Sequence, residues 1–188
     1  MTTRRADTAR PAVGLVIRDA NEEDMVRVQR IYAHHVLHGI ASFEEDAPAL
    51  EQMLARRSNV LRQGLPFLVA ELEGAVIGYS YAAPYRARSG YRYTIEDSVY
   101  MADGLSGQGV GYSLLMSLIE RCELGSWRQM IAVIGDSSNE ASIRLHSKLG
   151  FTHVGTLRSV GFKLGRWVDS VLMQRELGPG DTTLPRLP

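Results

Sequence analysis

A glycine-rich segment, Ser106-Gly107-Gln108-Gly109-Val110-Gly111, carries the clearest chemical signal in this sequence. Residues 94–101 before it have the character of a β-strand, and residues 112–122 after it place apolar side chains at helical spacing. Glycines let backbone N–H groups approach an anion, and the start of a helix adds unpaired donors with a partial positive charge. The segment therefore predicts a site for a phosphorylated ligand, with an ordinary helix-entry turn as the alternative.

Arginines and tyrosines are interleaved just before that strand. Arg86, Arg88 and Arg92 belong to this run, and guanidinium groups suit the bidentate capture of a small carboxylate. A basic and aromatic run can also bind nucleic acid, but this one is short, and 21 basic residues balance 21 acidic ones in the chain. We therefore expect no nucleic-acid partner. The alternative for each arginine is a solvated loop position.

Three histidines, His34, His35 and His38, have a spacing that suggests a metal cluster. Residues 34 and 38 would share one face of a helix, but no nearby carboxylate completes a site. We expect surface or interface histidines and no metal. Cys122, the only cysteine, lies on the apolar stripe after the glycine-rich segment, so we expect it to pack in the core rather than to react.

Periodicity and turn signals predict the elements that position these residues. We expect strands at residues 15–17, 67–72, 75–83, 94–101, 129–134, 152–160 and 168–175. We expect helices between Asn21 and Gly39, from an Asp46 cap with Pro48 in the first turn, over 112–122 and over 139–149. The order β-α-α-β-β-β-α-β-α-β-β indicates an α/β (α+β) fold, with a mixed central sheet of about seven strands and helices on both faces.

Length and composition limit the kind of protein. At 188 residues, the chain suits a single domain, which we place at residues 14–177, after a disordered lead-in at 1–13 and before a flexible tail at 178–188. The sequence contains no apolar run long enough to span a membrane, and residues 1–10 lack the apolar segment of a secretory signal. We therefore expect a cytoplasmic protein without a membrane partner.

Five stretches match one protein family in order and spacing. They are Ala41-Ser42-Phe43-Glu44 and residues 93–100, 107–111, 139–151 and 160–169. Over roughly residues 16–177 the chain resembles the GCN5-related N-acetyltransferases (GNAT), and within them the phosphinothricin and methionine-sulfoximine acetyltransferase group. The family signature has Gln or Arg where this chain has Ser106, so backbone donors, with Gln108 as a compensating contact, would hold the pyrophosphate.

The resemblance implies the GNAT fold and acetyl-CoA as the cofactor. The pyrophosphate would bind at the glycine-rich segment, and the thioester would lie where two parallel strands splay apart. The implied cofactor-binding residues are Val99, Tyr100, Met101, Ser106, Gly107, Gln108, Gly109, Val110, Gly111, Tyr112, Asn139 and Ser142. Asn139 has a helix cap as its alternative role.

The resemblance assigns the proton transfers to Glu96 and His146. An amine that attacks a thioester must be neutral, although an α-amino group has a pKa near ~8. A carboxylate within reach can accept the proton, which makes Glu96 the general base; the alternative is a solvent-facing charge. His146 would donate a proton or a hydrogen bond to the leaving thiolate; the alternative is an ordinary helix-face histidine.

The implied reaction is the direct transfer of acetyl to the primary amine of a small amino-acid-like acceptor, such as phosphinothricin, methionine sulfoximine or methionine sulfone. The acceptor would contact Phe43, Glu44, Tyr81, Arg86 and Arg92. The group often forms homodimers, and we expect the hairpin at residues 162–167 to take part. A non-catalytic acyl-CoA sensor and a protein or peptide N-acetyltransferase are the alternatives.

Overall fold

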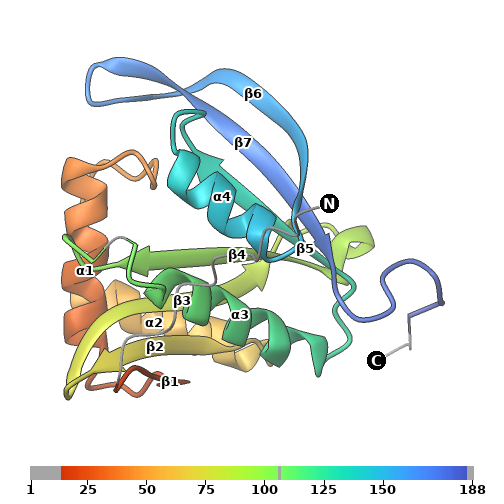
Figure 1. The fold of residues 1–188 in the computed structure, drawn as a ribbon, viewed down its shortest axis with the longest axis horizontal. Helices are drawn as coiled ribbons and strands as arrows, with labels where there is room; N and C mark the ends of the chain where they lie inside the picture. The colour runs from red at the N-terminus through yellow and green to blue at the C-terminus, as the bar shows by residue number, and fades with distance from the viewer. Residues whose placement is uncertain (1–13, 106, 186–188) are drawn as a thin grey trace, which may run out of the picture.

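The structure is a computed structural model that describes residues 14–105 and 107–185. Its strands form one seven-stranded sheet in the order β1-β2-β3-β4-β5-β7-β6 (Figure 1). The order of elements along the chain is the predicted one, and the fold class is confirmed. The elements are β1 (Val16–Asp19), α1 (Met25–His38), α2 (Leu50–Arg62), β2 (Phe67–Leu72), β3 (Ala75–Pro84), a 3₁₀ turn (Ser89–Tyr91), β4 (Thr94–Met101), α3 (Val110–Glu123), β5 (Gln129–Gly135), α4 (Glu140–Lys148), β6 (Thr152–Lys163) and β7 (Arg166–Glu176).

The middle of the sheet holds the parallel pair, β4 with β5. Residues 94–96 pair with residues 129–131, and the described residues of β4 and β5 make no further pairs with each other, although β4 also pairs with β3 and β5 with β7. Both nevertheless continue, to Met101 and Gly135, and they diverge as they do so (Figure 1). We call this divergence the wedge. It leaves main-chain groups of two strands without a strand partner at the centre of the molecule.

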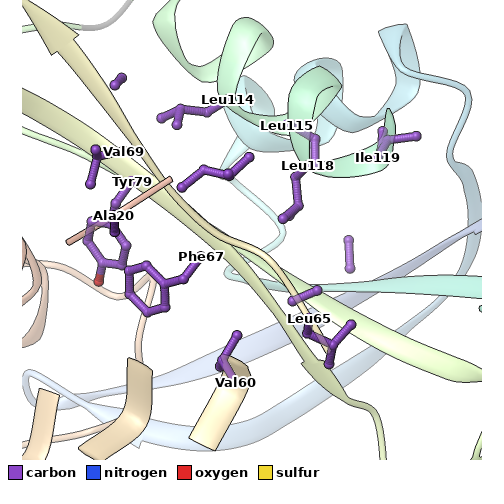
Figure 2. Packing of buried hydrophobic residues seen from close by; sticks show 14 of the residues in the cluster. Ala20, Val60, Leu65, Phe67, Val69, Tyr79, Leu114, Leu115, Leu118 and Ile119 are labelled. Atoms are coloured by element: carbon purple, nitrogen blue, oxygen red, sulfur yellow. The ribbon is translucent and has the colours of Figure 1, made fainter. Parts of the chain in front are cut away.

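Helices cover both faces of the sheet. α3 packs on β1 to β4, whereas α1 and α2 pack on β2, β3 and β4. Figure 2 shows Leu114 and Leu118 of α3 on one side of the strands and Phe67 and Tyr79 on the other. These four side chains are at most 1% exposed. The face predicted for the first helix is buried throughout, at Met25, Val28, Ile31, Tyr32 and Val36.

The second helix begins later than predicted. Its first residue is Leu50, and its cap is Ala49, whose N–H donates to the side chain of Gln52 at 2.8 Å. Asp46 is therefore not the cap, and Pro48 lies outside the helix. The physical reason is that the residue before a proline avoids the helical conformation, so the helix cannot include the residue between the proposed cap and Pro48.

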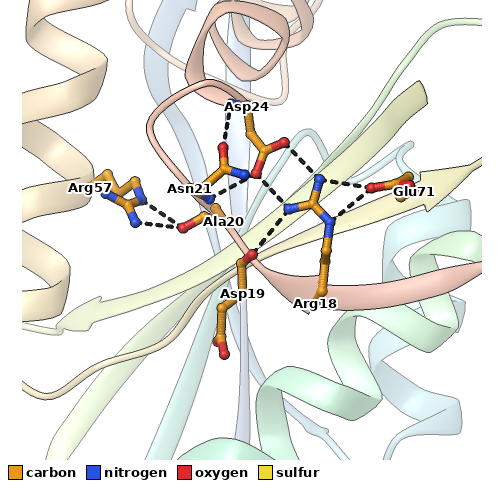
Figure 3. A network of polar contacts seen from close by, with 7 residues as sticks. All are labelled: Arg18, Asp19, Ala20, Asn21, Asp24, Arg57 and Glu71. Carbon is orange, nitrogen blue, oxygen red and sulfur yellow. Dashed lines mark hydrogen bonds and ion pairs between the residues drawn. The ribbon is translucent and has the colours of Figure 1, made fainter. Parts of the chain in front are cut away.

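A polar network fixes the start of α1 against the sheet (Figure 3). Arg18 on β1 donates to the two carboxylate oxygens of Asp24, at 2.7 and 2.8 Å, and to Glu71 on β2 at 2.8 Å. Asn21 and Asp24 exchange side-chain to main-chain hydrogen bonds. The helix nevertheless begins at Met25 with Asp24 as its cap, so the expected start at Asn21 is wrong. The hydrogen bonds from Arg18 hold the pKa of Asp24 below its ordinary value. The network therefore orders α1, which supplies part of the site.

The two ends of the chain are described only in part. The predicted lead-in at 1–13 and residues 186–188 of the predicted tail lie outside the described residues. Within the tail, Gly180, Thr183 and Leu184 accept hydrogen bonds from Arg128. The division of the chain at residues 14 and 177 stays a prediction. Among the described helices, none is both long and apolar enough to cross a membrane.

Candidate active site

A cavity of about 550 Å³ lies at the wedge. Its walls come from α1, the segment at residues 41–44, α2, β3, β4, β5 and α4. Along β4 it extends from Glu96 to Asp103 and Gly104, next to the glycine-rich segment. The structure thus brings together a large share of the predicted site residues: Phe43, Glu44, Tyr81, Glu96, Val99, Tyr100, Met101, Asn139, Ser142 and His146.

Glu96 is the last residue of β4 that pairs with β5, so it stands where the wedge opens. Burial raises the pKa of Glu96 from 4.5 to about 7, and the charge of the neighbouring Asp97 adds to the shift. The carboxyl group is half-buried rather than fully solvated. A carboxylate with a pKa near neutrality can take a proton from an amine and release it again at physiological pH.

His146 on α4 is buried and bonds to Asp97 on β4. Its Nε2 lies 3.1 Å from Asp97 Oδ2, and its Nδ1 lies 2.8 Å from the main-chain oxygen of Ser142. Both of these partners can accept a hydrogen bond from the ring. Burial lowers the pKa of His146, but the hydrogen bond and charge of Asp97 outweigh this effect, and the net shift is upward. Both ring nitrogens are therefore already engaged within the fold.

Asp97 is a site residue that the sequence reasoning missed. It is 7% exposed and lines the cavity, and its Oδ1 has no hydrogen-bond partner among the described residues. The available signal was the alternation of the strand, which places Asp97 on the same face as the buried Ile95. A carboxylate at a core-facing position needs a partner, and here that partner is His146.

The glycine-rich segment adopts a backbone that glycine favours. The φ angle is +82° at Gly107 and +79° at Gly109, in the left-handed region. Gly109 is the N-terminal cap of α3, and no side chain from the described residues caps that helix. The N–H groups from Val110 to Tyr112 have no acceptor inside the helix. These donors are consequently suited to an anion at the end of the cavity.

The other predicted cofactor residues are placed as follows. Ser106 lies outside the described residues, and Gln108 is exposed. Asn139 caps α4 by accepting from the N–H of Ser142 at 3.2 Å, and both residues line the cavity. The capping role of Asn139 is thus confirmed, and its side chain is also available to a ligand.

Aromatic and charged side chains meet on another part of the cavity wall. Phe43, Glu44 and Tyr81 lie on its wall. Arg56 of α2 joins them: it pairs with Glu44 at 2.8 Å, and its guanidinium carbon lies 4.9 Å from the centre of the Tyr32 ring. The sequence reasoning missed Arg56 because an arginine on an amphipathic helix has the pattern of a solvated residue until its tertiary neighbours are known.

Arg86 and Arg92 lie away from this group. Both are exposed. Arg86 stacks over the Tyr85 ring at 5.1 Å, and Arg92 lies 5.9 Å from the centre of the Tyr93 ring. Neither lines the cavity that the described residues form. Among the described residues of one chain, Arg56 is the arginine that lines the cavity.

His35 is more enclosed than the other two histidines for which we expect a surface or interface position. This residue is half-buried, lines the cavity, and places its Nε2 2.8 Å from the main-chain oxygen of Met101. Helical periodicity turns it towards the sheet, whereas His34 and His38 are exposed. Cys122 packs in the core as predicted: it is 1% exposed, and burial raises the pKa of its thiol to about 12.

The fold and the site together define a class of enzyme. A carboxylate with a pKa near neutrality sits at the start of a wedge that leads to a helix N-terminus suited to phosphate, as a coenzyme A-dependent acyltransferase requires. Residues 17–172 match the acetyltransferase (GNAT) domain family. The chain therefore belongs to the GNAT family, as its sequence motifs predict.

Similar proteins and a similar crystal structure support this assignment. The phosphinothricin N-acetyltransferase of Alcaligenes faecalis is 57% identical over 90% of this chain and 86% of its own length. The L-methionine sulfoximine/L-methionine sulfone acetyltransferase of Salmonella typhimurium is 39% identical over 87% of this chain and 95% of its own. The crystal structure of a phosphinothricin acetyltransferase from Sinorhizobium meliloti in complex with AcCoA superimposes with a TM-score of 0.89 at 43% identity, covering 92% of this chain and 94% of that one.

Proposed function

We propose that this protein transfers the acetyl group of acetyl-CoA to the primary amine of a small amino-acid-like acceptor. The observation that carries the proposal is the position of Glu96. It lies in the same cavity as an aromatic and charged group of side chains, and the lining of that cavity continues to Gly104, close in sequence to the glycine-rich segment. The two named enzyme groups among the relatives support an acceptor of the phosphinothricin or methionine-sulfoximine type.

The residues of the wedge fit acetyl-CoA. The free N–H groups at the start of α3 would hold its pyrophosphate, and the end of β4 with Asn139 and Ser142 would line the path of its pantetheine arm. Bound acetyl-CoA supplies an activated thioester carbonyl. We further propose that the protein works in the cytoplasm, where acetyl-CoA is available.

Glu96 would remove the proton from the ammonium group of the acceptor, directly or through one water. Transfer would then be direct, without an acyl-enzyme. The only thiol of the chain supports this conclusion, because Cys122 is buried on α3 and its pKa of about 12 leaves it protonated.

A panel of amines tests the proposed function. Phosphinothricin, methionine sulfoximine, methionine sulfone, free amino acids and a peptide would each be offered with acetyl-CoA, and thiol release would be followed. We expect turnover of the small amino-acid-like compounds. Coenzyme A binding without any turnover would favour the sensor, and turnover of the peptide alone would favour the protein acetyltransferase.

We propose that His146 acts through Asp97 rather than as the acid, since both of its ring nitrogens already face acceptors. Asp97→Asn should then move the acidic limb of the pH profile of kcat/KM to lower pH, because it removes a negative charge that raises the pKa of Glu96. Asp181→Asn, in the tail, is the control. If His146→Gln instead abolishes only the basic limb, His146 is the acid after all.

Arg56 is our candidate for the carboxylate of the acceptor. Arg56→Ala should raise the KM of the acceptor by about tenfold or more, since a charge-assisted hydrogen bond is worth about 1.5–3 kcal/mol, and should leave the KM of acetyl-CoA within about twofold. Arg92→Ala, remote from the cavity in one chain, is the comparison. If only Arg92→Ala raises the acceptor KM, the carboxylate of the acceptor binds at the arginine-containing loop before β4, as predicted from the sequence.

A homodimer is our proposal for the assembly. The hairpin of β6 and β7 lies at the edge of the sheet and exposes Phe162 to 57% and Trp167 to 65%. Apolar side chains on an edge strand favour pairing of the same patch across a twofold axis. Sedimentation should show a dimer for the wild type and a monomer for Trp167→Glu. A monomeric wild type at micromolar concentration would contradict the proposal.

A further inference from the structure

Lys163, at the end of β6, is a charged residue without a part in the reaction described above. It is 4% exposed, and its Nζ donates to the main-chain oxygen of Ser42 at 2.6 Å. The contact joins the C-terminal hairpin to the segment between α1 and α2, 121 residues earlier in the chain. Burial lowers the pKa of the Lys163 ammonium, and the carboxylates of Glu45 and Glu44 oppose that effect. A buried ammonium is costly, so its position calls for a function.

Ser42 is the centre of the segment that Lys163 holds. Residues 41–44 all line the cavity, and we call them the acceptor wall. The Oγ of Ser42 lies 2.8 Å from the hydroxyl of Tyr32 and accepts from the N–H of Glu44 at 3.2 Å. Glu44 in turn pairs with Arg56. Lys163 therefore reaches, through one main-chain oxygen, the group of residues proposed to receive the acceptor.

Two glycines let the C-terminal strands approach the same segment. A Cβ on Gly135 of β5 would collide with the main-chain oxygen of Ile40, and a Cβ on Gly161 of β6 would collide with the ring of Phe43. The φ angles of these two glycines are not in the left-handed region, so close approach is what favours glycine here. The acceptor wall therefore packs against the main chain of β5 and β6, and Lys163 holds it at Ser42.

We propose that Lys163 is a positioning residue for the acceptor, which fixes the acceptor wall through Ser42 while it lies outside the cavity. The inference rests on the proposed function, since it names the part of that site where the acceptor is oriented. It predicts a separation of effects. Within the described part of the chain, the hydrogen bond of Lys163 is to Ser42 and none reaches the glycine-rich segment, so the acceptor should lose affinity and acetyl-CoA should not.

Lys163→Met tests the proposal, because methionine keeps an unbranched apolar chain and removes the ammonium. Lys148→Met is the matched control, since the other lysine of the chain is exposed at the end of α4. We expect the acceptor KM to rise about tenfold or more in Lys163→Met, with the KM of acetyl-CoA and the Kd of coenzyme A within about twofold. An unchanged acceptor KM, or an equal rise for both substrates, would overturn the proposal.

Hydrogen exchange tests the role of Lys163 independently of whether the protein acetylates an amine. Amides of residues 40–45 should exchange faster in Lys163→Met than in the wild type or in Lys148→Met, whether or not an amine is acetylated. Unchanged exchange would show that Lys163 does not hold the wall. Gly161→Ala provides a second variant if Lys163→Met does not fold. Its Cβ displaces Phe43, so it should also raise the acceptor KM and spare coenzyme A binding; failure to do so counts against the proposal.

Discussion

Replacement of Glu96 by glutamine should lower kcat at pH 8 by about a hundredfold or more, because a positioned general base contributes about 10²–10⁴-fold. Glutamine keeps the size and hydrogen-bonding capacity of the side chain but cannot accept a proton. The affinity for coenzyme A should stay within about twofold, since the glycine-rich segment is untouched. Steady-state rates by thiol release and calorimetry with coenzyme A measure the two quantities.

The same role of Glu96 predicts the direction in which kcat/KM changes with pH. Below a pKa of about 7 the carboxyl group of Glu96 is protonated and cannot act as a base. The wild-type kcat/KM should therefore rise with pH and level off above neutrality, and Glu96→Gln should lose that limb. Glu120→Gln, an exposed carboxylate on α3, is the control. A variant with wild-type turnover at neutral pH would remove Glu96 from the mechanism.

Stability provides a check that is independent of turnover. The pKa of Glu96 is raised from 4.5 to about 7 in the folded state, so its contribution to stability is fully present below pH 4.5 and is lost as the pH rises through 7. Above pH 7 the folded protein must bury the charged carboxylate of Glu96. Glu96→Gln should therefore be more stable than the wild type at pH 8, by at most about 3 kcal/mol, and the difference should vanish at acidic pH.

Gly109→Val should abolish coenzyme A binding measurable by calorimetry, a loss of about a hundredfold or more. The φ angle of +79° at this position is strained for a β-branched residue, and the side chain would stand at the start of α3, among the donors proposed for the pyrophosphate. Two charge-assisted hydrogen bonds are worth about 3 kcal/mol or more, which accounts for the expected loss.

Gly74→Val separates strain from ligand contact. Gly74 lies in the turn between β2 and β3, has the same φ of +79°, and faces open space. The Gly74→Val variant should be less stable than the wild type, as Gly109→Val should be, but it should keep its affinity for coenzyme A. Wild-type affinity in Gly109→Val, or an equal loss of affinity in both variants, would contradict an anion site at the start of α3.

Local patterns in the sequence predict most of this fold. The order of elements, the buried face of α1 and the strand, glycine turn and helix around Gly109 all follow from periodicity and from the few residues that allow positive φ. The late start of α2 was also within reach, since Pro48 restricts the residue before it. Local signals succeed here because neighbouring residues decide each of these features.

The candidate site is only half predictable, for a physical reason. Glu96 and the residues of β4 lie in one stretch, so a motif can find them. Asp97 with His146, and Lys163 with Ser42, are pairs 49 and 121 residues apart, and no local pattern shows which side chain faces another across a sheet. Arg56 is missed on the same ground, because its role depends on the neighbours that α1 and the acceptor wall bring to it.

The junction between β4 and β5 is short. Main-chain bonding between the two strands is confined to their first residues, with pairs between 94–96 and 129–131 and hydrogen bonds from Arg128 and Gln129 to the main-chain oxygen of Tyr93. α3 covers the strands on one side of this junction, and α4 packs on β5 and β6. One hydrophobic core spans both parts of the sheet, so any local opening starts at the edges of β4 and β5 that face each other. A ligand bridging the two parts would favour the closed ensemble by mass action, so protease resistance of this enzyme should follow the supply of its donor substrate.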